Sequence, residues 1–461
     1  GLVVSSIFGW ILVDGKFLLW SGLQPEFVQT VLYVVGAFII LGITTTNRFG
    51  YPKFCRLLIS IVCVIGIFLY GIAIEVHWFS PEKSYFLVGG LIPSSDAESW
   101  YSGAWRLLEL NTLSAYDQIR PLNAALHAFR LFLMGDYQSS VMFAALIAGA
   151  TSIFVALIIR QSLGWIATGI FFVVSLSLIR SHLPLAMTEI HGYIFGSLAF
   201  GLLWLSATNR SVLYFALGLG LLSIALNCRT GPLFVLPALL LWGGILFSTS
   251  TKRSIWAISF GTIGIASGFV ISKLFLTLWG DDHGMLYSNF SYTLYGMAVG
   301  GKKWTQILVD HPEILSIPYG VERRQEVYRL AIEALQENPL LFVSYYLKQL
   351  AFFLFSFVKY DLVKVPYYFL FSVYQAITVV AGCWVVFCWR EPLARLGIFM
   401  FLGVLFSAPF LMQDAGKSLR EILKQKFDIN LFCKAINNFT SMQLDVSDNV
   451  NDFIDIGVPD W

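Results

Sequence analysis

Charged side chains are scarce in this chain. Lysine, arginine, aspartate and glutamate make up 13% of the 461 residues, whereas hydrophobic residues make up 57%, and the mean hydropathy is +0.72. That much apolar surface exceeds what one water-soluble core can bury, so the composition excludes an ordinary soluble enzyme. The net charge of only +2, without any run rich in lysine or arginine, argues against nucleic-acid binding. The composition therefore predicts a polytopic membrane protein.

The sequence also lacks the motifs of several common enzyme classes. No GxGxxG or Walker sequence occurs, so no nucleotide-binding loop is predicted. The six cysteines stand singly, several of them within apolar runs, and no CxxC pair or metal-ligand spacing is present. We interpret them as small core residues. Chemistry in this chain is therefore expected from polar groups between the membrane spans.

Long apolar runs predict an all-α fold with about 10–12 transmembrane helices. Two spans are expected at Val28–Thr45 and Arg56–Ile74. Further spans are expected at 139–159, 162–179, 190–206, 211–227, 231–248, 254–279, 366–389 and 393–412. Residues 1–21 are either a span or an interfacial helix. Residues 340–358 either cross the membrane or lie in its interface or re-enter, and we prefer the second interpretation.

Basic residues between the first two spans predict which polar loops face outward. The loop that holds Arg48 and Lys53 is expected on the cytoplasmic side by the positive-inside rule. The following span then places residues 75–138 outside, and the same parity places residues 280–339 outside. Apolar side chains in 75–138 fall on one helical face in each of two segments, first Trp100, Ala104, Leu107 and Leu108, then Leu122, Leu126, Phe129 and Leu133. The pattern predicts two amphipathic helices along the membrane.

The composition changes abruptly after Gly416. Residues 417–461 are polar and mixed in charge, unlike the apolar chain before them. We therefore divide the chain into a transmembrane domain at 1–416, with outer loops at 75–138 and 280–339, and a tail at 417–461. The tail is either a small soluble domain or a separate segment.

Asp96 is the strongest candidate for a chemical role. It lies in the first long polar interruption of the chain, directly after Ser94 and Ser95, and Glu98 follows two residues later. One interpretation is a solvated or helix-capping carboxylate. The other is a general base that removes the proton of an acceptor hydroxyl, which requires an ionised carboxylate beside the reacting oxygen. Because a helical position i+2 turns away, Asp96 and Glu98 are not expected to form one dyad.

Two arginines at predicted span ends are candidates for anion binding. Arg120 precedes Pro121, and Arg229 precedes a Thr-Gly-Pro sequence that breaks the backbone. Each could simply extend its charge to the membrane surface. Alternatively, the planar guanidinium groups could hold a phosphate leaving group. Lys302 and Trp304, in the Gly-Gly-Lys-Lys-Trp sequence, form either a surface turn or a contact to a phosphate or sugar.

Glu189 and His191 stand at the outer entrance of a predicted span, where ionisable groups are costly unless paired. They either cap the helix or pair with Arg180, or they contact substrate. Together with Asp96 and His283 they could supply a divalent-metal site, but no spacing requires one. The sequence therefore assigns no metal ligand.

Several short motifs resemble the GT-C superfamily of membrane glycosyltransferases, in particular the protein O-mannosyltransferase branch that includes the lipid A aminoarabinose transferases. Asp96 followed by Tyr101 and Ala104 resembles the acidic motif of the first outer loop. Arg120-Pro121-Leu122 resembles the basic-Pro-Pro-Leu element later in that loop. Further resemblances are Gly135-Asp136, Glu189 at the start of a span, the stretch 227–237 and the stretch 407–416 that contains Asp414.

The resemblance implies a GT-C-like fold and an inverting transfer of a sugar from a polyprenyl-phosphate donor at the outer membrane face. Asp96 would be the base, and Arg120 and Arg229 would hold the lipid phosphate. The acceptor would be a lipid, a glycan or a protein, and the location a bacterial inner membrane. The chain departs from the family at Ala97, which separates two acids that usually adjoin, and in lacking a clear arginine after Asp414. A transporter or lipid flippase and a non-catalytic subunit of a membrane complex remain alternatives.

Overall fold

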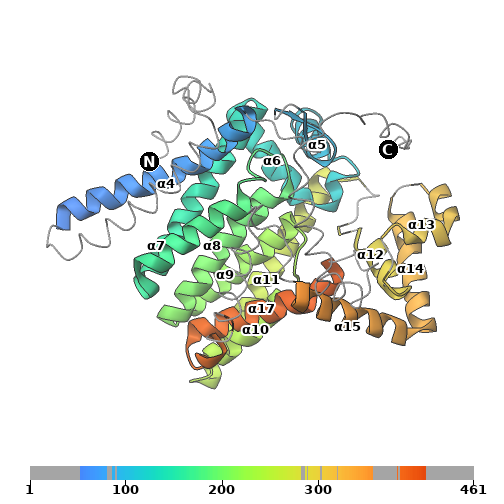
Figure 1. Ribbon diagram of the computed structural model, residues 1–461. Coiled ribbons are helices and arrows are strands. Elements are labelled where there is room, and N and C mark those ends of the chain that lie inside the picture. Colours follow the sequence, from blue (N-terminus) through green and yellow to red (C-terminus); the bar gives the residue numbers. More distant parts are fainter. Residues whose placement is uncertain are drawn as a thin grey trace, which may run out of the picture. The chain divides into compact units, whose positions relative to one another are not determined.

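The computed structural model (Figure 1) divides the chain into two compact units, Gly1–Gln413 and Asp414–Trp461. The residues that the structure describes all belong to the first unit: 52–79, 86–88, 91–281, 286–287, 289–301, 304–318, 320–356, 382 and 385–411. The segments 1–21 and 28–45, the tail, and all of the predicted span 366–389 except 382 and 385–389 lie outside these residues.

The described part of the chain is mostly helical, as the sequence predicts. Its β structure is a short antiparallel pair between β1 (Leu87–Val88) and β2 (Ile92–Pro93). Four of the described helices are long and apolar enough to cross a membrane: α7 (Tyr137–Ile179), α8 (Thr188–Asn209), α11 (Thr251–Trp279) and α17 (Pro392–Leu411). Shorter apolar helices or segments accompany them in α4 (Pro52–Phe79), α9 (Val212–Cys228) and α10 (Val235–Leu246). The chain is therefore a helical membrane protein in its described part.

Helix α7 is two helices joined at Gly164. This residue has φ 78° and ψ −173°, a conformation that glycine adopts readily and that a side chain disfavours. Across the turn, Thr168 Oγ1 donates to the Ala156 carbonyl at 3.3 Å. Both arms also approach α4, because Gly66 lies beside Ile153 and Phe172. The 43-residue helical stretch therefore corresponds to the two predicted runs, 139–159 and 162–179.

Helices α7, α8, α9 and α11 lie side by side in that order (Figure 1). Close contact between α9 and α11 depends on a Gly-x-x-x-Gly pair on α11. A Cβ on Gly264 would lie 2.4 Å from the Ala216 carbonyl oxygen, and one on Gly268 would lie 2.4 Å from Ser223 Oγ. Small residues at this spacing let two helix backbones approach in a membrane, where no hydrophobic effect drives them together.

The first predicted outer loop contains helices α5 (Asp96–Leu110) and α6 (Pro121–Met134), separated by the short 3₁₀ helix η1 (Asp117–Ile119). The buried face of α5 matches the prediction at Trp100, Ala104 and Leu107, and Leu108 is half-buried. The predicted apolar face of α6 is buried at Leu122, half-buried at Leu126 and exposed at Phe129 and Leu133.

Helix α6 instead buries polar side chains. Asn123, His127 and Arg130 are each at most 4% exposed, whereas Phe129 and Phe132 are 56% and 73% exposed. Burying polar groups and exposing aromatic rings is the reverse of the arrangement in a water-soluble helix. It is the arrangement expected of a helix that contacts lipid, where intramembrane polar residues face the protein interior.

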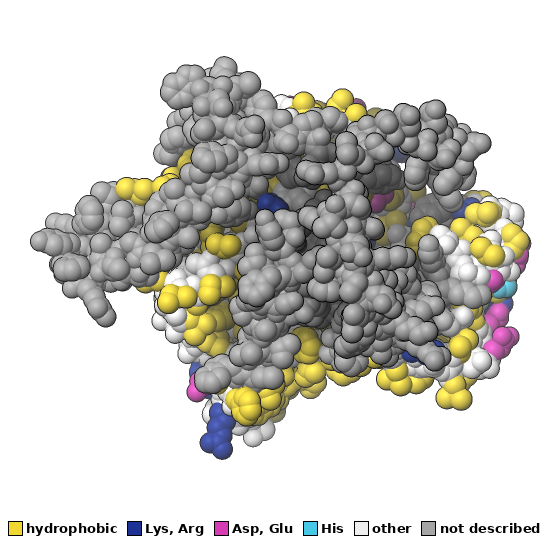
Figure 2. Space-filling view, viewed as in Figure 1, with side chains coloured by type: hydrophobic (Ala, Val, Ile, Leu, Met, Phe, Trp, Pro, Cys, Tyr) yellow, Lys and Arg dark blue, Asp and Glu magenta, His cyan; other side chains and the backbone are white. Residues whose placement is uncertain are grey.

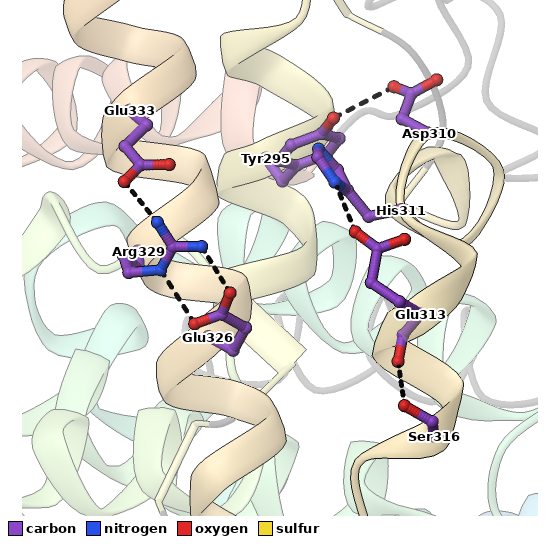
Figure 3. A network of polar contacts seen from close by, with 8 residues as sticks. All are labelled: Tyr295, Asp310, His311, Glu313, Ser316, Glu326, Arg329 and Glu333. Atoms are coloured by element: carbon purple, nitrogen blue, oxygen red, sulfur yellow. Dashed lines mark hydrogen bonds and ion pairs between the residues drawn. The ribbon is translucent and has the colours of Figure 1, made fainter.

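The second predicted outer loop forms a separate small cluster of helices around Tyr292, Ile307 and Val327. It contains α12 (Asn289–Ala298), α13 (Gln306–Asp310), the 3₁₀ helix η2 (Pro312–Ser316) and α14 (Val321–Glu337). Figure 3 shows the polar surface of this cluster, where Arg329 pairs with Glu326 and Glu333, and Tyr295 donates to Asp310. Helix α14 ends before Pro339, as predicted, and α15 (Pro339–Ser356) follows.

The long apolar helices and the small cluster of helices α12–α14 expose different kinds of side chains (Figure 2). Hydrophobic side chains are exposed on the long helices, including Ile166 on α7 and Ile263 on α11. Acidic side chains are concentrated over α13 and α14. The difference is consistent with long helices that face lipid and a small cluster of helices that faces water.

Candidate functional site

A cavity of about 150 Å³ lies where α5, α6, α8 and α9 begin or end. Its walls combine one carboxylate, two guanidinium groups and two aromatic rings. The lining residues are Asp96, Trp100, Tyr116, Ile119, Arg120, Met187, Thr188, Arg229 and Asn289. The cavity therefore brings together Asp96, Arg120 and Arg229, the three residues on which the predicted site depends.

Asp96 is the first residue of α5, and its side chain is exposed at the cavity. The preceding Ser95 has φ 55°, a turn that directs the chain from β2 into the helix. A carboxylate in the first helical turn is favoured by the helix dipole. Tyr116 lines the same cavity, and the negative charge of Asp96 contributes to a raised pKa of the Tyr116 hydroxyl. Glu98 is also exposed but does not line the cavity, since it lies two residues further along the helix.

Arg120 is placed by the start of α6. It is the N-cap residue, with the extended φ of −143° that is usual before proline, and Pro121 fills the first helical position. Its Nη1 lies 3.5 Å from Thr188 Oγ1 at the start of α8. The Arg120 side chain thus extends from the N-terminus of α6 into the cavity and contacts the N-terminus of α8.

Arg229 reaches the same hydroxyl from the end of α9. Its Nη1 donates to Thr188 Oγ1 at 3.1 Å and forms an ion pair with Glu189 Oε1 at 3.0 Å. Thr188 Oγ1 in turn donates to Glu189 Oε2 at 3.2 Å. Glu189 therefore neutralises Arg229, and the pairing with Arg180 considered from the sequence is wrong.

Arg120 has no such partner among the described residues. It forms no ion pair there, and its buried Nε has no hydrogen-bond acceptor. Burial lowers the pKa of Arg120 and the positive charge of Arg229 lowers it further, whereas the negative charges of Glu189 and Asp96 oppose the change. Arginine stays protonated under such shifts, so the group remains a cation without an ion pair among the described residues. A ligand with a negatively charged oxygen would satisfy it.

Three predicted residues lie elsewhere in the described structure. Tyr101 packs its ring against Tyr137 and Trp105, with a centroid distance of 5.1 Å to Tyr137. His191 is buried, and its Nδ1 lies 2.7 Å from Asn123 Oδ1. Trp304 is 51% exposed in the small helical cluster. None of the three lines the cavity.

Lys302, His283 and Asp414 lie outside the described residues. Within the described residues, no group of three or more histidine, cysteine, aspartate or glutamate side chains is arranged to hold a metal ion. Of the four side chains that could supply one, Asp96 lines the cavity, Glu189 binds Arg229 and His191 binds Asn123.

The cavity also contains residues that the sequence analysis did not single out. Tyr116 and Thr188 contact the predicted residues directly, and Trp100 was predicted only as part of an apolar helix face. A signal existed for Thr188, because it immediately precedes Glu189 at the start of a span. No local pattern marks Tyr116, since it lies in an irregular segment whose position depends on the fold.

Comparison of this chain with protein-family models, curated proteins and solved structures gives no match.

Proposed function

We propose that this protein is a membrane glycosyltransferase that moves a sugar from a polyprenyl-phosphate donor to an acceptor at the outer membrane face. The observation that supports it is the cavity that joins Asp96 to Arg120 and Arg229, which are far apart in the sequence. A carboxylate beside two guanidinium groups combines a proton acceptor with an anion site, the two functions that transfer from a phosphate requires.

In the proposed reaction, Asp96 accepts the proton of the acceptor hydroxyl while that oxygen attacks the anomeric carbon. The bond between the anomeric carbon and the phosphate oxygen breaks, and its electron pair stays on the polyprenyl phosphate. The charge that develops there is stabilised by Arg120, whose guanidinium has no carboxylate partner in the described structure. This reaction is a single displacement at the anomeric carbon, which inverts its configuration, as the resemblance to GT-C glycosyltransferases implies.

The two arginines have different tasks in this proposal. Arg120 binds the phosphate directly. Arg229 is held by Glu189 and shares the Thr188 hydroxyl with Arg120, so it fixes the geometry of the site and adds positive charge at its edge. Because the ion pair with Glu189 is only partly exposed, it is more than a fully solvated surface pair.

The lipid-facing helix α6 suits a donor that stays in the membrane. Arg120 stands at its N-terminus, and Phe129 and Phe132 project outward from the following turns. A polyprenyl chain beside such a face would keep its phosphate close to Arg120.

Purified protein in lipid vesicles, supplied with a panel of polyprenyl-phosphate monosaccharides, tests the proposal. Release of polyprenyl phosphate reports transfer to an acceptor or, more slowly, to water. We expect Asp96→Asn to lower the rate on the order of 10²-fold or more, because it removes the base. Glu109→Gln, which changes an exposed carboxylate of the same helix, is the matched control and should keep the wild-type rate.

Two outcomes would contradict the proposal. If Asp96→Asn folds and transfers sugar at the wild-type rate, Asp96 is not the base. If no donor of the panel is cleaved but labelled lipid crosses the vesicle membrane, the chain is a transporter or flippase. A non-catalytic subunit would show neither sugar transfer nor lipid movement, with or without the substitution Asp96→Asn.

A further inference from the structure

Tyr116 lies at the cavity with Asp96 but comes from a different segment. It belongs to the connection between α5 and α6, whereas Asp96 begins α5. Both side chains line the cavity of about 150 Å³, so the Tyr116 hydroxyl and the Asp96 carboxylate face the same small space. Because a carboxylate can accept several hydrogen bonds, one from Tyr116 would leave other acceptor positions of Asp96 available to a substrate.

The ring of Tyr116 is fixed by Trp100. The two ring centroids are 4.9 Å apart, with an interplanar angle of 57°. Trp100 is 2% exposed and lies four residues after Asp96, on the same face of α5. The helix that carries the carboxylate therefore also carries the ring against which its partner packs.

The residue after Tyr116 anchors the connection to α5. Asp117 is fully buried and accepts a hydrogen bond from Ser114 Oγ at 2.5 Å, and the Ser114 hydroxyl accepts one from the Asp117 backbone N–H at 3.1 Å. The Asp117 carboxyl also lies directly against Gly103 of α5, where an added Cβ would be only 2.0 Å from Oδ2.

The same connection is attached to the end of α11. The Leu113 backbone N–H donates to the Trp279 carbonyl at 2.7 Å, and Gln118 contacts Asp281. Contacts on both sides of Tyr116 thus define its position before any substrate binds. A side chain held in its working position before substrate binds lowers the entropy cost of reaching the reactive geometry.

From this arrangement we infer that Tyr116 is a positioning residue, whose hydroxyl orients the Asp96 carboxylate toward the acceptor hydroxyl. The inference rests on the proposed glycosyl transfer. Burial and the nearby charge of Asp96 raise the pKa of Tyr116, so its hydroxyl stays protonated and remains a donor near neutral pH. Without it, the exposed carboxylate would sample rotamers in which it points away from the substrate.

The test is the substitution Tyr116→Phe, which keeps the ring against Trp100 and removes only the hydroxyl. With the polyprenyl-phosphate panel as donors, kcat should fall about 10- to 100-fold, because misplacing a reacting group has effects of this size. KM for the donor should change less than twofold, since Arg120 binds the phosphate. Tyr328→Phe, at a half-buried tyrosine of α14, is the control and should leave both constants unchanged.

A double substitution separates positioning from a general loss of stability. If Tyr116 acts through Asp96, adding Tyr116→Phe to Asp96→Asn should cause no further loss of the residual rate. An equal further loss in that background, an unchanged kcat in the single variant, or a fall in kcat accompanied by a lower Tm would each overturn the inference. Failure of the proposed function itself is recognised separately, because Asp96→Asn alone would then keep the wild-type rate.

Discussion

At the scale of single residues, Asp117 shows how burial changes a carboxyl group. Burial raises its pKa from an ordinary value of 3.8 to about 6, although the hydrogen bonds from Ser114 oppose the change. In the unfolded chain the group has its ordinary value, so the folded protein binds an extra proton between these two pH values. The stabilisation from this proton is complete below about pH 4 and is lost as the pH rises through about 6.

We therefore expect the free energy of unfolding to contain a component that decreases by roughly 2 kcal/mol between pH 4 and pH 6.5, from about 1.36 kcal/mol per pKa unit. Asp117→Asn cannot ionise and should remove that component. Unfolding curves of both proteins in detergent at several pH values measure the difference. An equally steep pH dependence in the variant would show that another group is responsible.

Charged residues that interrupt apolar runs were the sequence signal that the structure brings together in space. Asp96, Arg120 and Arg229 were chosen for that reason, and all three line one cavity. Tyr101 and His191 were chosen for their neighbours in the sequence and lie in packing contacts instead. Tyr116 was missed because its approach to Asp96 depends on Gly103 and the end of α11, two contacts distant in the sequence.

At the scale of elements, the turn within α7 depends on one glycine. Gly164 has a positive φ, and a Cβ built on it meets nothing within 4 Å. Gly164→Ala would therefore add backbone strain without a clash, at a cost of about 1–3 kcal/mol. Gly135, at the end of α6, also has a positive φ and open space, but its ψ of −25° lies closer to the left-handed helical region that other residues adopt.

We expect Gly164→Ala to lower Tm more than Gly135→Ala in the same detergent. The pair is matched because neither substitution creates a contact, so a difference reports backbone conformation alone. If the two variants unfold at the same temperature, the tight turn at Gly164 does not determine how the two arms of α7 pack.

Helix positions were more predictable than helix faces. The apolar runs between 139 and 279 coincide closely with α7 to α11, because long runs of hydrophobic residues identify spans directly. For α6 the sequence predicted an apolar face on a helix along the membrane, but it did not show which polar side chains would be buried. His127 and Arg130 turn inward, whereas Phe129 and Phe132 turn outward, as in a helix that contacts lipid.

At the scale of the whole molecule, two exposed isoleucines distinguish lipid-facing from water-facing surface. Ile263 is 62% exposed near the middle of α11, one of the helices apolar enough to cross a membrane. Ile332 is 47% exposed on α14, the helix that also carries Glu326, Arg329 and Glu333 of Figure 3. If Ile263 faces lipid and Ile332 faces water, a lysine should be unfavourable at Ile263 and tolerated at Ile332.

Ile263→Lys should reduce the yield of membrane-integrated protein, because a lysine at the centre of a span costs about 2.5–3.5 kcal/mol on insertion scales. Ile332→Lys should leave that yield unchanged, since its side chain is already next to solvated charges. The measurement is the fraction of each variant that resists alkaline extraction from membranes. If both lysines are tolerated equally, α11 does not face lipid at Ile263. The cavity at Asp96 would then need another explanation than a site reached from within the bilayer.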